Sequence, residues 1–295
     1  MRMDIITTRT HLSGISKRSS GHMTTIIAHV GDLHVNSSVA LMPPEVHKDD
    51  GQVVSASRTQ KWLWSKWLSY WEETARYKEQ TGAKVIGVIN GDWGDMNTHS
   101  GFQLVEPNNP DTVIDMMVAT VGPMRKVCDE IVVVRGTEAH TGGAGWLENR
   151  AAQEIGAVRN ENENTWSWYI WEAEVDGVKL TSSHHPGTNS GRPWTKGNEA
   201  NRRAMMDVYN YLGRDWQPRL TLWGHYHHNA DSHDTHPIRA IYNRAWQVKT
   251  SFVYRIGMAT QPDQVGGLWA FCHNGKLHVE KREYKLPRPK PWTQS

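Results

Sequence analysis

Cysteine is scarce in this sequence: Cys128 and Cys272 are the only two among 295 residues. Two thiols are too few for the disulfide frameworks of small secreted domains, and their scarcity favours a reducing compartment, so we expect a cytoplasmic protein. Long apolar runs are also lacking, and none approaches the roughly 18 residues that a membrane-spanning helix needs. A strong charge of one sign is missing as well, since the formal net charge is +2. Composition alone therefore does not indicate a nucleic-acid-binding or membrane protein.

A single folded domain is the simplest organisation for this length, because the chain has no internal repeat and no Gly/Ser-rich linker. The first 22 residues are rich in Ser, Thr and basic residues and lack the apolar segment of a secretory signal. We expect residues 1–22 to be an unstructured extension, residues 23–285 to form one domain, and the Pro-rich residues 286–295 to be a loose tail.

Apolar runs typical of buried strands alternate with helical patterns in the first half of the chain. The expected strands cover residues 24–30, 84–89 and 130–134, and the expected helices cover residues 58–80, 111–127 and 146–156. The apolar face of the first helix is expected to hold Trp64, Trp67, Leu68, Trp71 and Ala75. This alternation predicts an α/β fold with a largely parallel sheet covered by helices.

The second half of the chain predicts a further, mixed sheet. Asp176 and Gly177 form a strong hairpin signal between strands at residues 166–175 and 178–183. A helix over residues 197–212 and a strand over residues 219–223 follow, and residues 249–284 have the pattern of short strands separated by turns. One face of that helix holds Met205, Val208, Tyr209 and Leu212.

Each of five predicted strands runs into a segment that carries carboxylates or imidazoles. These segments are residues 31–34 (GDLH), 91–95 (GDWGD), 136–140 (GTEAH), 183–186 (SHHP) and 224–228 (GHYHH). Ligands of an open α/β sheet bind at the carboxyl ends of its strands, so five such segments in succession predict a common site. Carboxylates and imidazoles without thiolates favour Mn, Fe or Zn over Ca. Two such ions that share a carboxylate would lie about 3.5–4 Å apart and activate a water between them.

In this order these residues resemble the calcineurin-like metallophosphoesterases, over residues 31–228 of the chain. The resemblance implies a two-sheet αββα sandwich of the metallophosphoesterase type and a dinuclear centre. The ligands that it implies are Asp32, His34 and His227 for one ion, Asp92 as the bridge, and His184 and His225 for the other. It also implies that Asp95 orients a ligand or the catalytic acid by hydrogen bonding.

The segment after the third strand departs from the family's pattern of Gly, Asn, His and Asp or Glu. Thr137 stands where the family has an Asn that binds the second metal, and Thr is a poorer ligand. Glu138 could take the place of that Asn. His140, two positions later than the family's His, is our candidate for the acid that protonates the leaving group.

The residues that flank the expected ligands have weaker claims. His185 and His228 each follow a ligand directly, so we expect their side chains to point away from the metals. Arg192 and Lys196 follow His184 and could steer an anionic substrate into the site.

The sequence thus predicts a dinuclear metal-dependent phosphoester hydrolase, a phosphodiesterase or phosphatase, that attacks with a metal-bridging hydroxide. Its cofactors would be two divalent metal ions, with Mn first and Fe, Zn or Mg as alternatives. Its partner would be a phosphoester substrate, which could be a nucleic acid or a nucleotide. We expect no interaction with a membrane. A DNA exonuclease or endonuclease of the same superfamily and an inactive scaffold that retains the fold stay open as alternatives, and the sequence does not predict the oligomeric state.

Overall fold

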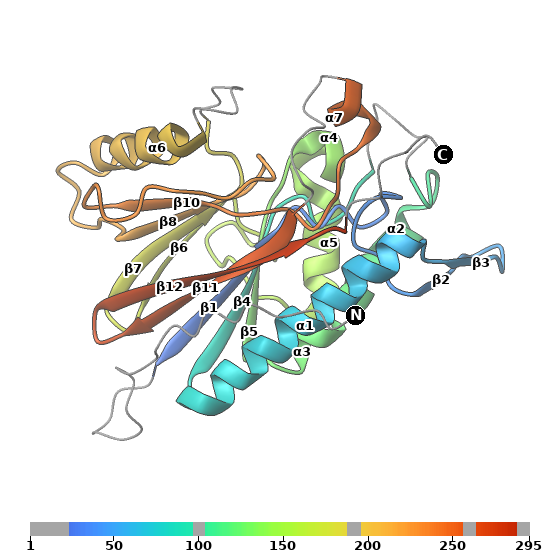
Figure 1. The fold of residues 1–295 in the computed structure, drawn as a ribbon, viewed down its shortest axis with the longest axis horizontal. Helices are drawn as coiled ribbons and strands as arrows, with labels where there is room; N and C mark the ends of the chain where they lie inside the picture. Colours follow the sequence, from blue (N-terminus) through green and yellow to red (C-terminus); the bar gives the residue numbers. More distant parts are fainter. Residues whose placement is uncertain (1–23, 97–103, 188–195, 256–263, 288–295) are drawn as a thin grey trace, which may run out of the picture.

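The computed structural model describes residues 24–96, 104–187, 196–255 and 264–287. Two five-stranded sheets lie face to face, and helices cover the outer face of each (Figure 1). The expected extension 1–22 and most of the expected tail 286–295 lie outside the described residues. In the described part of the chain, no helix is both long and apolar enough to cross a bilayer.

The first sheet has a parallel half and an antiparallel half. Its strands, in spatial order, are β12 (Lys276–Lys285), β11 (Gln264–His273), β1 (Thr25–Gly31), β4 (Lys84–Asn90) and β5 (Glu130–Val134). β1, β4 and β5 are parallel, as the sequence predicts, and all seven residues of β1 are buried. β11 and β12 add an antiparallel hairpin from the end of the chain. The expectation of short strands there is wrong, because each strand has ten residues and one turn joins them.

The second sheet is mixed, as predicted. Its strands, in spatial order, are β6 (Ile170–Val175), β7 (Val178–Ser183), β8 (Leu220–Trp223), β10 (Arg239–Tyr242) and β9 (Ala230–Asp231). Asp176 and Gly177 both have positive φ, 48° and 76°, which is the backbone of a tight hairpin turn between β6 and β7. β7 and β8 are parallel, so the carboxyl ends of both strands lie at one edge of the sheet.

An apolar layer joins the two sheets. Ile27 and Val88 of the first sheet pack in one cluster with Leu180 and Leu222 of the second, and all four are fully buried. A sheet that buries residues on this inner face and is covered by helices on its outer face is one half of an αββα sandwich. The predicted fold class is therefore confirmed.

Most of the helices cover the outer faces of the sheets, whereas the short α4 and α7 lie beyond the strand ends (Figure 1). The helices are α1 (Arg58–Thr81), α2 (Pro110–Thr120), α3 (Gly122–Arg125), α4 (Glu138–Thr141), α5 (Trp146–Ile155), α6 (Lys196–Asn210) and α7 (Ser251–Arg255). A further small hairpin pairs β2 (Glu45–His47) with β3 (Val53–Ser55). One long helix was expected over residues 111–127. The chain instead forms α2 and α3, because Pro123 has no N–H with which to continue the first helix.

Helix α1 shows how the local sequence fixes a helix and its buried face. Ser57 and Gln60 form a reciprocal capping box at its start, and Gly82 ends it in the left-handed conformation, with φ of 67°. Trp67 and Trp71 are buried as expected, whereas Leu68 is 37% exposed. The buried stripe is therefore rotated slightly from the predicted one.

Helix α6 presents small residues to the second sheet. Ala200 and Ala204 are fully buried against it, whereas Met205 and Tyr209 are 46% and 69% exposed. The large apolar residues of this helix therefore face outward, and its packing could not be inferred from their spacing.

Candidate metal centre

The five segments predicted to carry ligands meet at one edge of the sandwich. The parallel strands β1, β4 and β5 end side by side, and backbone hydrogen bonds continue beyond them, from His34 N–H to Asp92 O (2.8 Å) and from Gly91 N–H to Val134 O (3.0 Å). The ends of β7 and β8 reach the same place, since His184 Nδ1 lies 3.0 Å from Asn90 O. The topology therefore collects side chains that are far apart in the sequence, such as His34 and His227, which are 193 positions apart.

Several candidate ligands stand on an unusual backbone. Asp32, His34, Asp92, His225 and His227 all have positive φ, between 44° and 72°. Outside glycine this conformation is uncommon and costs about 1–3 kcal/mol per residue, and it clusters at functional sites. The surrounding fold therefore holds these five side chains in position against the local preference of the backbone.

A first group consists of Asp32, His34 and His227. His34 Nε2 lies 3.1 Å from His227 Nε2, and His227 Nε2 lies 3.2 Å from Asp32 Oδ1. One ligand atom from each of the three residues lies within 4.8 Å of the others. Two imidazole nitrogens that face one another beside a carboxylate are an arrangement in which all three can bind one cation.

Asp92 lies between this first group and a second one. Its Oδ2 is 3.9 Å from His34 Nε2 and 3.0 Å from His184 Nε2. Asp92, Asp32 and His184 are all buried and themselves form a possible ligand group. The carboxylate of Asp92 is thus within reach of both groups.

The second group consists of His184, His185 and His225. One ring nitrogen from each lies within 4.8 Å of the others, and the ring centroids of His185 and His225 are 4.5 Å apart. Thr137 Oγ1 adjoins this group, at 3.4 Å from His225 Nδ1 and 3.2 Å from Asp92 Oδ2. We expected His185 to point away, but the chain bends at His184, so the alternation of side chains along the strand no longer holds there.

His140 and Asp95 form a pair beside the first group. His140 Nδ1 lies 3.0 Å from Asp95 Oδ1, and Asp95 Oδ2 lies 3.7 Å from His34 Nδ1. The side chain of His140 remains 25% exposed, whereas that of Asp95 is buried. Asp95 can therefore orient both His140 and His34 by hydrogen bonding or charge.

The charges in the site are strongly coupled. Burial alone would lower the pKa of His184, but the nearby carboxylates of Asp92 and Asp32 outweigh burial and raise the pKa to about 10. Burial would raise the pKa of Asp92, yet His184 and His34 hold it well below its usual value. Burial and the neighbouring His184 lower the pKa of His225 to about 4. The two buried carboxylates thus demand compensating positive charge, which a proton or a cation can supply.

One buried nitrogen also fits a cation. His184 Nε2 is fully buried, and its contact with Asp92 Oδ2, at 3.0 Å, does not have the geometry of a hydrogen bond. A buried polar atom whose hydrogen-bonding capacity is not met in this way calls for a specific reason. A cation bound between His184 and Asp92 would satisfy it.

Glu148 supports the site from behind, a role for which the sequence has no signal. This fully buried residue of α5 accepts hydrogen bonds from Trp93 N–H (2.9 Å) and Gly136 N–H (2.6 Å). Burial and the charge of Asp92 raise its pKa to about 7. Glu148 therefore connects the two segments that carry Asp92 and Thr137.

Glycine is required where these two segments approach each other. A Cβ atom on Gly136 would lie 2.1 Å from the backbone nitrogen of Asp92 and 2.2 Å from its Oδ1. No side chain fits in that space.

Other predicted site residues are not brought into the groups. Glu138 accepts a hydrogen bond from Ala144 N–H (3.2 Å) and belongs to none of the ligand groups found among the described residues. His228 faces away, as expected, with its Nε2 3.1 Å from Glu199. Arg192 lies outside the described residues, and Lys196 begins α6 with its side chain outside the described part.

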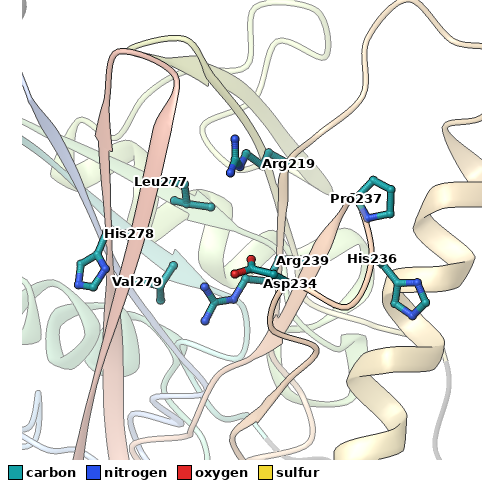
Figure 2. A pocket seen from close by; sticks show the side chains of 8 residues that line it. All are labelled: Arg219, Asp234, His236, Pro237, Arg239, Leu277, His278 and Val279. Atoms are coloured by element: carbon teal, nitrogen blue, oxygen red, sulfur yellow. The ribbon is translucent and has the colours of Figure 1, made fainter.

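A cavity elsewhere in the molecule is unrelated to these ligands. Its volume is about 550 Å³, and it is lined by residues that begin strands, among them Arg219, Arg239 and Leu277 (Figure 2). It therefore lies at the edge of the sandwich opposite the carboxyl ends of β1, β4 and β8. Arg239 is already paired there with Asp231, at 2.7 Å.

Comparison with known proteins gives structural similarity alone. No family model matches the chain, and a comparison with curated proteins found no match. Three similar solved structures are a dimetal phosphatase from Danio rerio, a 5'-nucleotidase from Candida albicans and Vps29 from Chaetomium thermophilum. For the phosphatase, the identity is 9%, the TM-score is 0.46, and the match covers 88% of this chain and 98% of the other.

The other two similarities are of the same order. The 5'-nucleotidase match has 9% identity and a TM-score of 0.45, and covers 91% of this chain and 53% of the other. For Vps29, the identity is 12%, the TM-score is 0.37, and the coverages are 90% and 98%. With TM-scores below 0.5, these similarities assign no activity to this chain. The residues that carry the resemblance to the calcineurin-like metallophosphoesterases in the sequence nevertheless lie together at one edge of the sandwich.

Proposed function

We propose that this chain is a metal-dependent phosphoester hydrolase with two divalent cations. The observation that carries the proposal is the convergence of buried carboxylates and imidazoles around Asp92, which lies 3.0 Å from His184 and 3.9 Å from His34. A purely structural cluster would not need several of these side chains on a strained backbone, nor a fully buried imidazole nitrogen held 3.0 Å from a buried carboxylate oxygen.

The proposed ligands divide between the two cations. Asp32, His34 and His227 would hold one, His184 and His225 would hold the other, and Asp92 would contact both. When bound, the two cations would polarise the phosphoryl oxygens and lower the pKa of a water molecule. Manganese was our first expectation for the metal and stays a proposal, with iron, zinc and magnesium as alternatives.

His140 is the proposed acid. Burial would lower its pKa, but the hydrogen bond with Asp95 and the charge of Asp92 outweigh burial and raise it. His140 Nδ1–H would donate a hydrogen bond to Asp95 Oδ1, 3.0 Å away. Nε2 can then carry the proton that protonates the oxygen of a leaving group. Asp95 would thereby fix the orientation of the ring.

Partial exposure supports substrate access. His227 and His140 have side chains that are 35% and 25% exposed, while Asp32 and Asp92 are buried. The substrate phosphate would therefore approach from the side of these two imidazoles. Arg192 and Lys196 are retained as proposed substrate-binding residues, and a cytoplasmic location is retained because Cys128 and Cys272 are both unpaired.

The experiment that tests the proposal measures hydrolysis of bis-p-nitrophenyl phosphate and p-nitrophenyl phosphate by the protein loaded with Mn²⁺ or Zn²⁺. Asp92→Asn removes the shared negative charge and is expected to abolish turnover. His233→Ala, on an exposed imidazole outside the ligand groups, is the matched control and is expected to keep full activity.

The outcome also separates the alternatives. Preference for the diester leads to single-stranded DNA as the next substrate and tests the nuclease. Preference for the monoester indicates a phosphatase. Bound metal without hydrolysis of any phosphoester would contradict the proposed activity and favour the inactive scaffold.

A further inference from the structure

The second ligand group contains one imidazole more than the two that we assigned to the second cation. Ring nitrogens of His184, His185 and His225 lie within 4.8 Å of one another. The ring of His185 is nearly perpendicular to that of His184, at 83°, and tilted by 59° from that of His225. Rings that meet at such angles do not stack face to face, and the separation of their nitrogens is short enough for all three to contact one ion.

The residue expected to complete this group is a poor ligand. Thr137 stands where the resembled family has a metal-binding Asn, and its hydroxyl is 3.2 Å from Asp92 Oδ2. Its backbone N–H donates to Asp92 Oδ1, 2.6 Å away. Thr137 is thus already engaged with the carboxylate, and a neutral hydroxyl is a weaker donor to a cation than an amide oxygen or an imidazole.

His185 is available to take that place. The contact of its Nε2 with Thr137 Oγ1 is 3.5 Å, at the limit of a hydrogen bond. The bend at His184 turns His185 toward the group, and Pro186 restricts His185 to extended backbone conformations. A small rotation of the exposed ring of His185 would direct a nitrogen to the same point as those of His184 and His225.

We infer that His185 is a third imidazole ligand of the second cation, and that it strengthens the preference of this centre for Zn²⁺ or Co²⁺ over Mn²⁺. The inference rests on the proposed function, since it concerns the same pair of cations. Three imidazoles and one carboxylate form a nitrogen-rich set, and nitrogen ligands favour Zn²⁺ and Co²⁺ more than they favour Mn²⁺. It revises our first expectation of manganese for this one centre.

The experiment titrates the metal-free protein with Zn²⁺ and with Mn²⁺, and counts the ions bound per chain by calorimetry and mass spectrometry. In the wild type we expect two sites for Zn²⁺. In His185→Ala we expect one tight site to remain and the other to weaken at least tenfold, because removal even of a group that only supports a ligand costs 10–100-fold. His185→Asn, which supplies an amide oxygen, should bind Mn²⁺ more tightly relative to Zn²⁺ than the wild type does.

A matched control distinguishes the loss of a ligand from the loss of an imidazole that is merely next to one in the sequence. His228 follows His227 as His185 follows His184, but its Nε2 contacts Glu199. His228→Gln keeps a polar side chain there and should bind both ions as the wild type does. Visible absorption of the Co²⁺-loaded protein supplies a second measurement, since losing a nitrogen ligand should change the d–d bands in His185→Ala and leave them unchanged in His228→Gln.

The two proposals fail in different ways. Two ions bound with unchanged affinity and an unchanged Co²⁺ spectrum in His185→Ala would overturn the role of His185 and leave the dinuclear hydrolase standing. A wild-type chain that binds no ion would overturn both. Circular dichroism of the metal-free variants checks that the fold is intact, which we expect because His185 is exposed.

Discussion

At the scale of single residues, the site combines groups that bind with groups that move a proton. Asp32 and Asp92 are buried and negatively charged, which suits a cation, whereas His140 is partly exposed and paired with Asp95. The distance of 3.0 Å between His140 Nδ1 and Asp95 Oδ1 fixes the ring. His34, Asp95 and His140 also lie close enough together to form a possible ligand group, but the proposed ligand set does not use His140. His140 should therefore matter for turnover more than for metal binding.

The variant His140→Ala tests this division. We expect kcat to fall by about 10²–10⁴-fold, the usual contribution of a general acid, while both ions stay bound. Activity and metal content are measured on the same sample. The variant should lose less activity toward a p-nitrophenyl ester, whose p-nitrophenolate leaving group needs no protonation, than toward an alkyl ester. Loss of an ion from the variant would show instead that His140 is a ligand.

The sequence predicts part of this residue-scale description. The meeting of Asp32, His34, His184 and His227 at one edge is predictable because each lies shortly after the end of a buried strand. His185 is not, since a bend of the chain decides its direction, and a bend has no reliable signal in the residues SHHP. Glu148 is not predictable either, because a single Glu in a helix is normally a solvated residue.

At the scale of elements, the turns after β4 and β5 act as one support. Glu148 of α5 accepts backbone hydrogen bonds from both turns, and Gly136 lets their backbones come into contact. The position of Asp92 therefore depends on Glu148 and Gly136, neither of which is a proposed ligand of a cation.

The variant Glu148→Ala should destabilise the protein. It leaves the N–H groups of Trp93 and Gly136 without a partner in a buried place, and we expect a loss of about 2–4 kcal/mol in the free energy of unfolding. Glu154→Ala, in the same helix but on a surface pair with Arg150, should cost less than about 1 kcal/mol. Chemical denaturation of the metal-free proteins measures both, and equal losses would contradict the supporting role of Glu148.

Two glycine substitutions test whether the close approach of the two turns positions Asp92. Gly136→Ala places a Cβ atom against the backbone of Asp92, so we expect it to displace Asp92 and weaken metal binding at least tenfold. Gly122→Ala is the control, because nothing lies within 4 Å of the added Cβ. Isothermal titration with Zn²⁺ distinguishes the two, and wild-type affinity in Gly136→Ala would show that the two turns can move apart freely.

At the scale of the whole molecule, the two sheets are also joined by charges at their open edge. Asp231 of β9 pairs with Arg239 of β10 and, across the sandwich, with Lys281 of β12. Burial would raise the pKa of Asp231, but the hydrogen bonds from Arg239 and Lys281 outweigh it and lower the pKa. The negative charge of Asp231 thus stabilises the folded chain.

The pH dependence of stability follows from the sign of that shift. A carboxyl group with a lowered pKa in the folded state stabilises the protein above its unfolded pKa, about 4, and this contribution disappears as the pH falls toward the lower folded value. We expect Asp231→Asn to cost about 1–2 kcal/mol at pH 7, with the difference from wild type shrinking below about pH 4. Urea denaturation at several pH values measures it; the exposed Asp215→Asn is the control, and a difference independent of pH would contradict the electrostatic origin.

The overall architecture was largely predictable, and its limits have physical causes. Buried strands such as β1 and β4 are continuous apolar runs, and the turn at Asp176 and Gly177 has a specific signature, so both sheets could be predicted. That β11 and β12 complete the first sheet depends on contacts between the two ends of the chain, which local patterns do not contain. The packing of α6 could not be predicted from local patterns either, because its large apolar side chains are the exposed ones.

We propose that the ends of five strands build a site for two cations, one on either side of Asp92. Anomalous X-ray diffraction from crystals of the zinc-loaded protein tests it most directly. We expect two anomalous peaks, one among Asp32, His34 and His227 and one beside His184 and His225, and loss of at least one peak in Asp92→Asn. No peak at this edge of the sandwich, or a single peak that Asp92→Asn leaves in place, would contradict it.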